Sequence, residues 1–502
     1  MVTFKTKELR SGIQYFSFCF FLLTAFFSIG YYHGDEHYQI IEFAGLKLGT
    51  HQPHELAWEF KEKLRSAFLP SLAFVQISIY KYLGVHDPYA QMKIIRIITA
   101  LFSFTGITIF IRKTEALLDQ PQLKLFYSFF SYLLWFIPFL AVRYSSETWS
   151  GIFFLIGLSF LISETSKTTS TFWVGVFFGL SFVCRYQMGI GVASVVIWLI
   201  VIKQYSLREL LKPLLGIIII TLLGIALDSW FYGEFTISWL YYFKATLLAA
   251  GEQDFGSSPW YFYLKQLLFY PNVVVGILMI TSFILLLTKK PKSVLIWIWI
   301  PFIAVHSLIP HKEERFIFPI AFTVALIISL GVEVSLFYLK KYKYAKTFLL
   351  SIGISFLMVN FVALFALSFK PAGIGRMAIS KYLHDNYGNH SINLIYCSWA
   401  SPYDPWHGLN AKFYLEKDYR GYRISNLCEL NDSLIDSSRK TFLAIRRVDL
   451  KVTDCEKNIE SLGFKLVKES TPSWVASLNN YYKGYDNEVI IMLFSRESND
   501  KN

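Results

Sequence analysis

Apolar runs long enough to cross a membrane recur along most of this chain of 502 residues. A helix needs roughly 17 to 25 predominantly apolar residues to span the hydrocarbon layer. Because 54% of the residues are hydrophobic and only 17% are charged, the composition is also typical of membrane proteins. The sequence predicts an all-α polytopic membrane protein with about 11 transmembrane helices. They are expected near residues 12–31, 90–111, 124–142, 149–163, 171–184, 188–203, 213–230, 271–288, 293–309, 316–338 and 347–368.

The basic residues lie mainly in short turns between these apolar runs. The formal net charge is +12. Because the Lys and Arg residues lie in these turns, we expect them to orient the helices in the bilayer, which argues against nucleic-acid binding. With the N-terminus in the cytoplasm and strict alternation, every basic turn faces the cytoplasm, provided that the interrupted run 67–84 is a re-entrant or interfacial helix. The basic turns are at 112–113, 167, 203–212, 289–292 and 340–346.

From about residue 370 the composition changes from apolar to mixed. The strand-like runs INLIYC, TFLAI and VIIMLF accompany a helical stretch, RMAISKYLHDNYG, with nearly balanced charge. We expect a transmembrane domain over 1–369 and a small soluble α/β domain over 370–502. Alternation places the α/β domain and two long loops, 32–66 and 231–270, on the lumenal or periplasmic side.

Cysteines and sequons in the tail agree with that location. Cys397, Cys428 and Cys455 allow one disulfide, and the sequence leaves the pairing open. The sequons at Asn389 and Asn431 would face the lumen in a eukaryotic host.

Ionisable residues gather at the helix ends that face the lumen or periplasm. A charge at the edge of a bilayer is costly unless it meets water or a partner, so such clusters are candidates for a functional site. The plainer interpretations are a solvated turn, an ordinary acidic loop pair and helix-end anchors. The candidates are Asp35, Glu36, Arg143, Glu147, Arg185, Asp228 and the consecutive residues His311, Lys312, Glu313, Glu314 and Arg315.

These residue types suit a transfer in which a phosphate leaves. A carboxylate such as Asp35 can take the proton from an attacking hydroxyl, while Lys312 and Arg315 can neutralise the leaving phosphate. Glycosidases need a second carboxylic acid to protonate a poor leaving alcohol. A lipid phosphate is already a good leaving group, so one base and a cationic clamp are sufficient.

Four histidines of the first loop raise the question of a metal site. Spacings of four and three residues, as in His33 with His37 and His51 with His54, would suit ligands on a helix. No HExxH motif or cysteine partner accompanies them, so we expect neither a metal nor a cofactor.

Several segments occur in a recognisable order. They read GDEHYQIIEFA, AWEFKEKLRSAFLP, RYSSET, DSWFYGEFTISWLYYFKATL, FGSSPWYFY and PHKEERFIFP. Together they resemble the membrane mannosyltransferases of the GT-C superfamily that use dolichyl-phosphate mannose in GPI-anchor and N-glycan assembly. In the tail, YCSWASPYDPWHG is similar to the Cys-His-Ser-Thr-Pro segment of the branch that adds the third GPI mannose. Here Ser398, Trp399 and Ala400 replace the family's His-Ser-Thr.

The resemblance implies an inverting transfer of mannose from a polyprenyl (dolichyl) phosphate to a lipid-linked glycan, with formation of an α-mannosidic bond. It implies that Asp35 is the base and Glu36 its support, without a metal ion or nucleotide-sugar site. The other candidates, together with Trp260, would bind the donor phosphate or the substrate. The enzyme would contact membrane lipids in the endoplasmic reticulum of a eukaryote or in a bacterial inner membrane. Its active site would face the lumen or periplasm.

Two other functions are compatible with the sequence. A bacterial polyprenyl-phosphate-sugar transferase would keep the fold and move another sugar onto an envelope lipid or glycan. A secondary transporter would have a similar number of helices, but transporters usually show two related halves, and no such symmetry is visible. Long polar loops suit an enzyme better.

Overall fold

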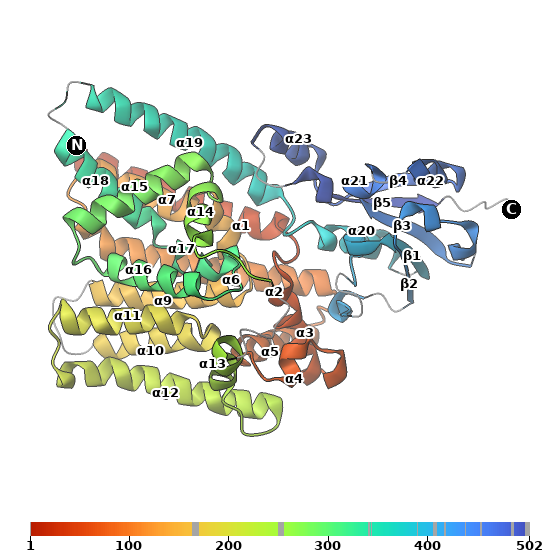
Figure 1. Ribbon diagram of the computed structural model, residues 1–502, viewed down its shortest axis with the longest axis horizontal. Coiled ribbons are helices and arrows are strands. Elements are labelled where there is room, and N and C mark those ends of the chain that lie inside the picture. Colours follow the sequence, from red (N-terminus) through yellow and green to blue (C-terminus); the bar gives the residue numbers. More distant parts are fainter. Residues whose placement is uncertain are drawn as a thin grey trace. The chain divides into compact units, whose positions relative to one another are not determined.

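The computed structural model divides the chain into two compact units, which are described separately (Figure 1). The first comprises Met1–Thr24, Glu62–Leu72 and Arg96–Phe365, and the second comprises Ala25–Lys61, Ala73–Ile95 and Ala366–Asn502. The structure describes residues 2–162, 170–248, 256–339, 342, 344–388, 390–404, 409–415, 418–436, 438–451, 454–482 and 486–496. Lys167 of the predicted basic turns and the sequon residue Asn389 lie outside these ranges.

The first unit is helical, and each predicted apolar run coincides with one or more helices. They are α1 (Val2–Phe27), α6 (Pro88–Thr114), α7 (Pro121–Leu133), α8 (Phe136–Ala141), α9 (Ser146–Ile162), α10 (Ser170–Cys184), α11 (Met188–Val201), α12 (Leu207–Tyr232), α15 (Val273–Lys289), α16 (Val294–Leu308), α17 (Phe318–Ala321), α18 (Val324–Leu339) and α19 (Ala345–Phe369). Two further helices, α13 (Ser238–Leu248) and α14 (Phe262–Phe269), lie within the predicted loop 231–270. Within the described residues, four helices are long and apolar enough to cross a membrane, or six if each of two bent pairs is one span. Four shorter apolar helices accompany them. The protein is a multi-pass membrane protein.

Two pairs of apolar helices are sharply bent where their helices meet. The α14 and α15 axes meet at 118°. Pro271 has no amide proton to donate at this point, and Asn272 adopts a left-handed backbone with φ of 76° while its side chain caps Val274. The predicted run 316–338 is bent by 67°, because it consists of the short helix α17 with its preceding turn and the longer helix α18.

Small residues let the helices of the first unit pack closely. The helices α9, α10 and α12 lie side by side (Figure 1). A Cβ added at Gly175 of α10 would lie 1.9 Å from the carbonyl oxygen of Pro213 on α12. Such close backbone approach is typical of membrane helices, whose association depends on van der Waals packing.

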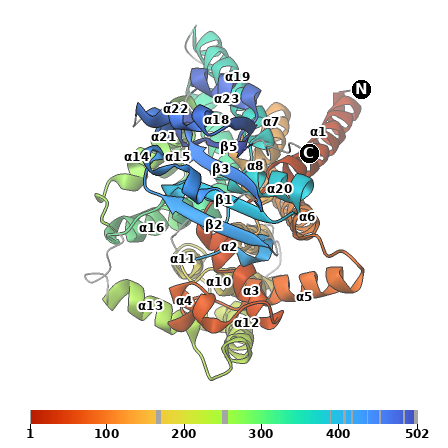
Figure 2. The same ribbon diagram turned by 90° about the vertical axis from the view of Figure 1, so that its right-hand side faces the viewer.

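The second unit contains a five-stranded sheet with strand order β2-β1-β3-β5-β4 (Figure 2). The strands are β1 (Ile392–Cys397), β2 (Tyr419–Ile424), β3 (Lys440–Arg446), β4 (Phe464–Glu469) and β5 (Ile491–Arg496). β1 is parallel to both β2 and β3, whereas β5 is antiparallel to β3 and β4. The three predicted strand runs overlap β1, β3 and β5, which confirms the mixed α/β character of the tail.

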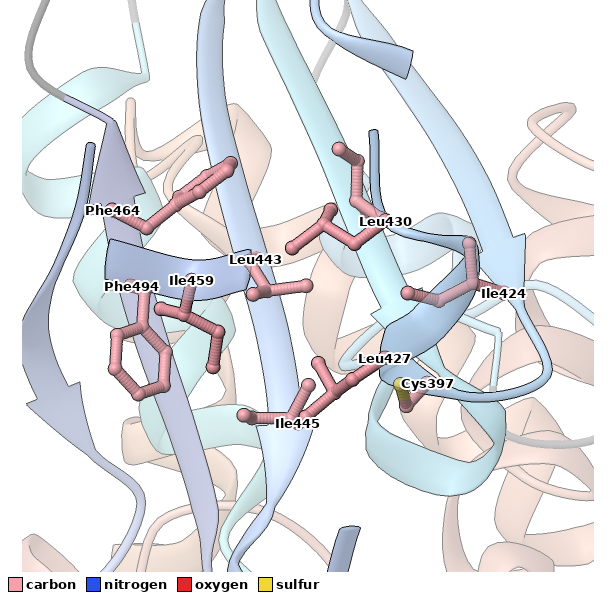
Figure 3. Close-up of a cluster of buried hydrophobic side chains, with 10 residues drawn as sticks. Cys397, Ile424, Leu427, Leu430, Leu443, Ile445, Ile459, Phe464 and Phe494 are labelled. Carbon is pink, nitrogen blue, oxygen red and sulfur yellow. The ribbon is translucent and has the colours of Figure 1, made fainter. Parts of the chain in front are cut away.

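Helices and a disulfide complete this unit. The helices of the tail are α20 (Arg376–Tyr387), which matches the predicted helical stretch, α21 (Arg447–Lys451), α22 (Lys457–Ser461) and α23 (Ser473–Tyr482). Figure 3 shows an apolar cluster that includes Leu443 of β3, Phe494 of β5 and Ile459 of α22. Cys428 and Cys455 form a disulfide, and Cys397 is buried as a free thiol.

Segments of the first loop and of the run 67–84 also belong to the second unit. They are α2 (Gly34–Tyr38), α3 (Ile41–Lys47), the 3₁₀ turn η1 (Pro53–Glu55), α4 (Trp58–Lys61) and most of α5 (Phe68–Tyr82). These short helices carry the acidic pair predicted from the sequence.

Candidate active site

The acidic pair lies in α2, a helix of five residues. His33 caps this helix, because its Nδ1 accepts a hydrogen bond of 3.3 Å from the Asp35 amide. The Glu36 carboxylate accepts a hydrogen bond of 3.2 Å from the Tyr32 amide. The Asp35 side chain remains 24% exposed. A carboxylate that is partly exposed at the start of a helix can meet a ligand from solvent and accept its proton.

A buried carboxylate that sequence reasoning missed lies beside this pair. Glu42 of α3 contacts the Nε2 atoms of both His37 and His51, and its distance to His37 is 2.5 Å. Burial by itself would raise the pKa of Glu42, but the two imidazoles outweigh burial and lower that pKa to about 2. Two of the four histidines considered as metal ligands therefore contact a carboxylate.

Three other predicted residues, Glu147, Arg185 and Arg315, form one charge network in the first unit. Glu147 lies in the first turn of α9, Arg185 directly follows α10, and Arg315 lies in the 3₁₀ turn η3 (Glu314–Ile317). The Glu147 Oε1 atom accepts hydrogen bonds from Arg185 Nη1 at 2.7 Å and from Arg315 Nη1 at 3.4 Å. All three side chains are at most 7% exposed, so the two guanidinium groups meet at a buried carboxylate.

A second carboxylate holds the other side of Arg315. Glu313 accepts a bidentate pair of hydrogen bonds from the Arg315 Nε and Nη2 atoms, at 2.5 and 3.1 Å. The ring of His311 is 2.9 Å from the same carboxylate. The Phe316 ring lies 5.4 Å from the Arg185 guanidinium carbon and 5.5 Å from that of Arg315. The plane and position of the Arg315 fork are thus fixed by charge-assisted bonds and by cation–π contact.

A glycine brings the two sides of this network together. Gly151 lies one turn beyond Glu147 on α9, and a Cβ at this position would lie 2.7 Å from the Pro319 carbonyl oxygen. Pro319 lies in the first turn of α17, just after the charged run. Only the absence of a side chain at 151 lets the two backbones come this close, which places Glu147 within reach of Arg315.

Other predicted residues have different surroundings. Lys312 donates to the Ser258 carbonyl oxygen at 2.7 Å, and Glu314 accepts from Gln266 at 3.4 Å. The fully buried Arg143 lies over the Phe139 ring at 5.0 Å. Asp228, near the end of α12, accepts from the Ala67 amide at 2.7 Å and from the Tyr186 hydroxyl at 3.3 Å. Trp260 is 67% exposed. Lys312 and Asp228 thus connect chain segments, whereas the network of Glu147, Arg185, Glu313 and Arg315 concentrates charge.

Comparison with known families identifies the chain. The model of the Alg9-like mannosyltransferase family matches residues 13–394, which is more than half of the sequence. The chain belongs to this family. The Alg9-like match covers the first loop and the predicted transmembrane runs from residue 13 onward, and it ends within β1. The resemblance seen in the sequence motifs is thereby confirmed.

Curated relatives of this Alg9-like chain include several mannosyltransferases. The mannosyltransferase APTG1 of Arabidopsis thaliana is 27% identical over 340 residues, which cover 64% of this chain and 59% of the relative. GPI mannosyltransferase 3 of Candida albicans is 25% identical over 61% of this chain and 60% of the relative. Human GPI alpha-1,2-mannosyltransferase 3 is 24% identical over 60% of this chain and 53% of the relative. The match thus spans between about half and three fifths of the length of these relatives.

Two solved structures with the same fold are those of ArnT and of the archaeal oligosaccharyltransferase AglB. ArnT from Cupriavidus metallidurans, bound to undecaprenyl phosphate, aligns with a TM-score of 0.54 and 11% identity over 96% of this Alg9-like chain and 97% of its own. AglB from Archaeoglobus fulgidus, in complex with an inhibitory peptide and a dolichol-phosphate, aligns with a TM-score of 0.52 and 10% identity. The alignment covers 92% of this chain and 73% of AglB. At these identities the likeness shows the fold alone, which is the GT-C type expected from the sequence.

Proposed function

We propose that this protein is an inverting mannosyltransferase that moves mannose from a polyprenyl (dolichyl) phosphate to a lipid-linked glycan of the GPI type. The observation that carries the proposal is the buried network in which Arg185 and Arg315 share Glu147. Two guanidinium groups held side by side match the oxygens of a phosphate in charge and in geometry. The names of the Candida and human relatives support a GPI glycan as the acceptor and an α-1,2 bond as the product.

In the proposed reaction, Asp35 acts as the base. The acceptor hydroxyl oxygen bonds to the anomeric carbon of mannose from the face opposite the phosphate, and its proton passes to the Asp35 carboxylate. The bond between that carbon and the phosphate oxygen breaks, and polyprenyl phosphate leaves. A β-linked donor thereby gives an α-linked product. Glu36, whose carboxylate is tied to the Tyr32 amide, supports the position of Asp35.

The guanidinium groups of Arg185 and Arg315 would stabilise the leaving phosphate. Negative charge grows on the phosphate as the bond to the sugar breaks, and preorganised cations at a buried site stabilise that charge strongly. Glu147 and Glu313 keep the arginines oriented before the donor arrives. His311, Lys312 and Glu314 shape the turn that carries Arg315, and Arg143, Asp228 and Trp260 belong to the wider substrate site in this proposal.

The proposed topology has eleven spans, a cytoplasmic N-terminus and an active site on the lumenal or periplasmic face. The membrane would be the endoplasmic reticulum in a eukaryote or the inner membrane in a bacterium. Position 290 should then be accessible from the cytoplasm and position 431 from the other side. Cysteine substitutions at these positions, labelled by an impermeant reagent in sealed, oriented membranes, test this. Labelling of position 431 from the cytoplasm would refute the eleven-span topology.

The activity is tested by incubating membranes that contain the protein with radiolabelled polyprenyl-phosphate mannose and lipid acceptors. We expect label in a lipid-linked glycan, and mass spectrometry of lipids from a deletion strain then identifies the acceptor that accumulates. Proteoliposomes that show substrate flux without any transfer would instead indicate a transporter.

A further inference from the structure

The helix that carries Asp35 is too short to hold its own position. Isolated helices of fewer than about 12 residues are marginal in water, and α2 has five. Successive residues of a helix are about 100° apart, so Asp35 and His37 point to opposite sides of α2. Asp35 is partly exposed, whereas His37 is 2% exposed. The buried face of α2, to which His37 and the equally buried Tyr38 belong, therefore holds the helix that carries Asp35.

Three contacts fix the position of His37. Its Nε2 atom is 2.5 Å from the Glu42 carboxylate. Its ring is stacked on that of Tyr31, with centroids 5.1 Å apart and an interplanar angle of 12°. It is also stacked on Tyr414, with centroids 5.2 Å apart and an angle of 23°. An imidazole that is stacked on two aromatic rings and hydrogen-bonded to a carboxylate has little freedom to rotate or shift.

Part of this support comes from the C-terminal region. The 3₁₀ turn η5 (Lys412–Tyr414) contacts the first loop through each of its residues. The Phe413 amide donates a hydrogen bond of 3.2 Å to Glu42, Tyr414 is stacked on His37, and Lys412 pairs with Glu55. Tyr414 also packs against Tyr89, at a centroid distance of 4.9 Å. The turn η5 thus touches both the hydrogen-bonding partner of His37 and the imidazole itself.

We propose that η5 positions the base of the transfer reaction, with Tyr414 acting through His37 as a positioning residue for Asp35. This inference rests on the proposed function, because it assumes that Asp35 takes the proton of the acceptor. It assigns the C-terminal region a role in the chemical step. A displacement of about 1 Å at a reacting group can lower a rate about a hundredfold, so loss of the stacked ring should be visible in turnover.

The test compares Tyr414→Ala with Tyr414→Phe in the purified full-length chain, with kcat and the KM for polyprenyl-phosphate mannose both measured. Phenylalanine keeps the stacked ring and removes only the hydroxyl. We expect Tyr414→Ala to lower kcat about tenfold or more while the donor KM changes less than about twofold, and Tyr414→Phe to keep at least about half of the wild-type kcat. Tyr414→Leu, which keeps apolar volume without a flat ring, should lower kcat at least about fivefold and replaces the alanine variant if that variant does not fold.

Tyr387→Ala is the matched control. The Tyr387 ring packs on Phe442 of β3, with centroids 4.8 Å apart, so this variant also loses an aromatic contact in the C-terminal region. Its kcat per folded molecule should stay close to that of the wild type. An equal loss of kcat in Tyr387→Ala and Tyr414→Ala would overturn the positioning role, as would an unchanged kcat in Tyr414→Ala or Tyr414→Leu.

Asp35→Asn, measured in parallel, separates this inference from the proposed function. If Asp35→Asn is inactive while both Tyr414→Ala and Tyr414→Leu turn over normally, the positioning role is wrong and the proposed base stands. If Asp35→Asn turns over normally, the proposed base itself is wrong.

Discussion

Replacement of Arg315 by lysine keeps the charge and removes the planar fork. The Arg315 guanidinium makes two hydrogen bonds to Glu313 and one to Glu147, through three different nitrogen atoms. A lysine ammonium cannot reproduce this pattern, because its donors radiate from a single nitrogen. We take the loss to be about one hydrogen bond to a charged partner, which is worth about 1.5 to 3 kcal/mol. If that energy is used in the transition state, transfer should fall about 10- to 160-fold.

The assay is transfer of labelled mannose from the lipid donor, with rates normalised to folded protein. Arg315→Ala should lose at least as much activity as Arg315→Lys. Arg10→Lys provides the matched control, since Arg10 pairs with Glu115 at 3.0 Å but is 42% exposed. An exposed pair contributes roughly 0 to 1 kcal/mol, so this variant should keep most of its activity. Full activity of Arg315→Lys would mean that the charged run only anchors a helix end and that Arg315 does not bind the donor phosphate.

Four further outcomes are expected. Asp35→Asn should lower transfer about a hundredfold or more without preventing membrane insertion, which activity and expression assays in the same membranes would check. Gly151→Val should lower both thermal stability and transfer, because a side chain there collides with the Pro319 backbone; an unchanged melting temperature in detergent would contradict this. Cys428→Ser should destabilise the sheet region by about 3 to 4 kcal/mol, since the disulfide joins cysteines 27 residues apart; limited proteolysis under non-reducing conditions would detect it. Ionised Glu42 stabilises its unit above the ordinary carboxyl pKa of 4.5, and this contribution falls as the pH drops towards about 2. The melting temperature of Glu42→Gln should therefore lie below that of the wild type at pH 6 and approach it near pH 3.

The transmembrane helices were predictable because hydropathy along the chain is enough to locate them. An apolar run of sufficient length must be a helix in a membrane, so all the predicted runs coincide with helices. The break at Asn272 was not predictable in the same way, because a left-handed residue after a proline changes the direction of the chain without changing its hydropathy. The pairing of Cys428 with Cys455, rather than with Cys397, required knowledge of which cysteine enters the core of the sheet.

The candidate site was predictable in its members but not in its contacts. The positive-inside rule put Glu147 and Arg315 at helix ends on one side, yet the two residues are 168 positions apart, and nothing local indicates that they meet. Glu42 was overlooked because a single glutamate in an apolar stretch gives no signal until its histidine partners are known. The contact between Glu42 and Phe413 was also hidden, since the composition of the tail suggests an independent domain.

The bond between the Phe413 amide and Glu42 has a consequence for biosynthesis. The two residues are 371 positions apart. At about 5 to 20 residues per second, a ribosome makes Phe413 roughly 20 to 75 s after Glu42. Throughout that interval the first loop has left the ribosome without the turn that later packs on His37. Quality-control chaperones therefore have a long period in which to bind the loop, and a mutation in the turn would extend that exposure even if every membrane helix had already inserted.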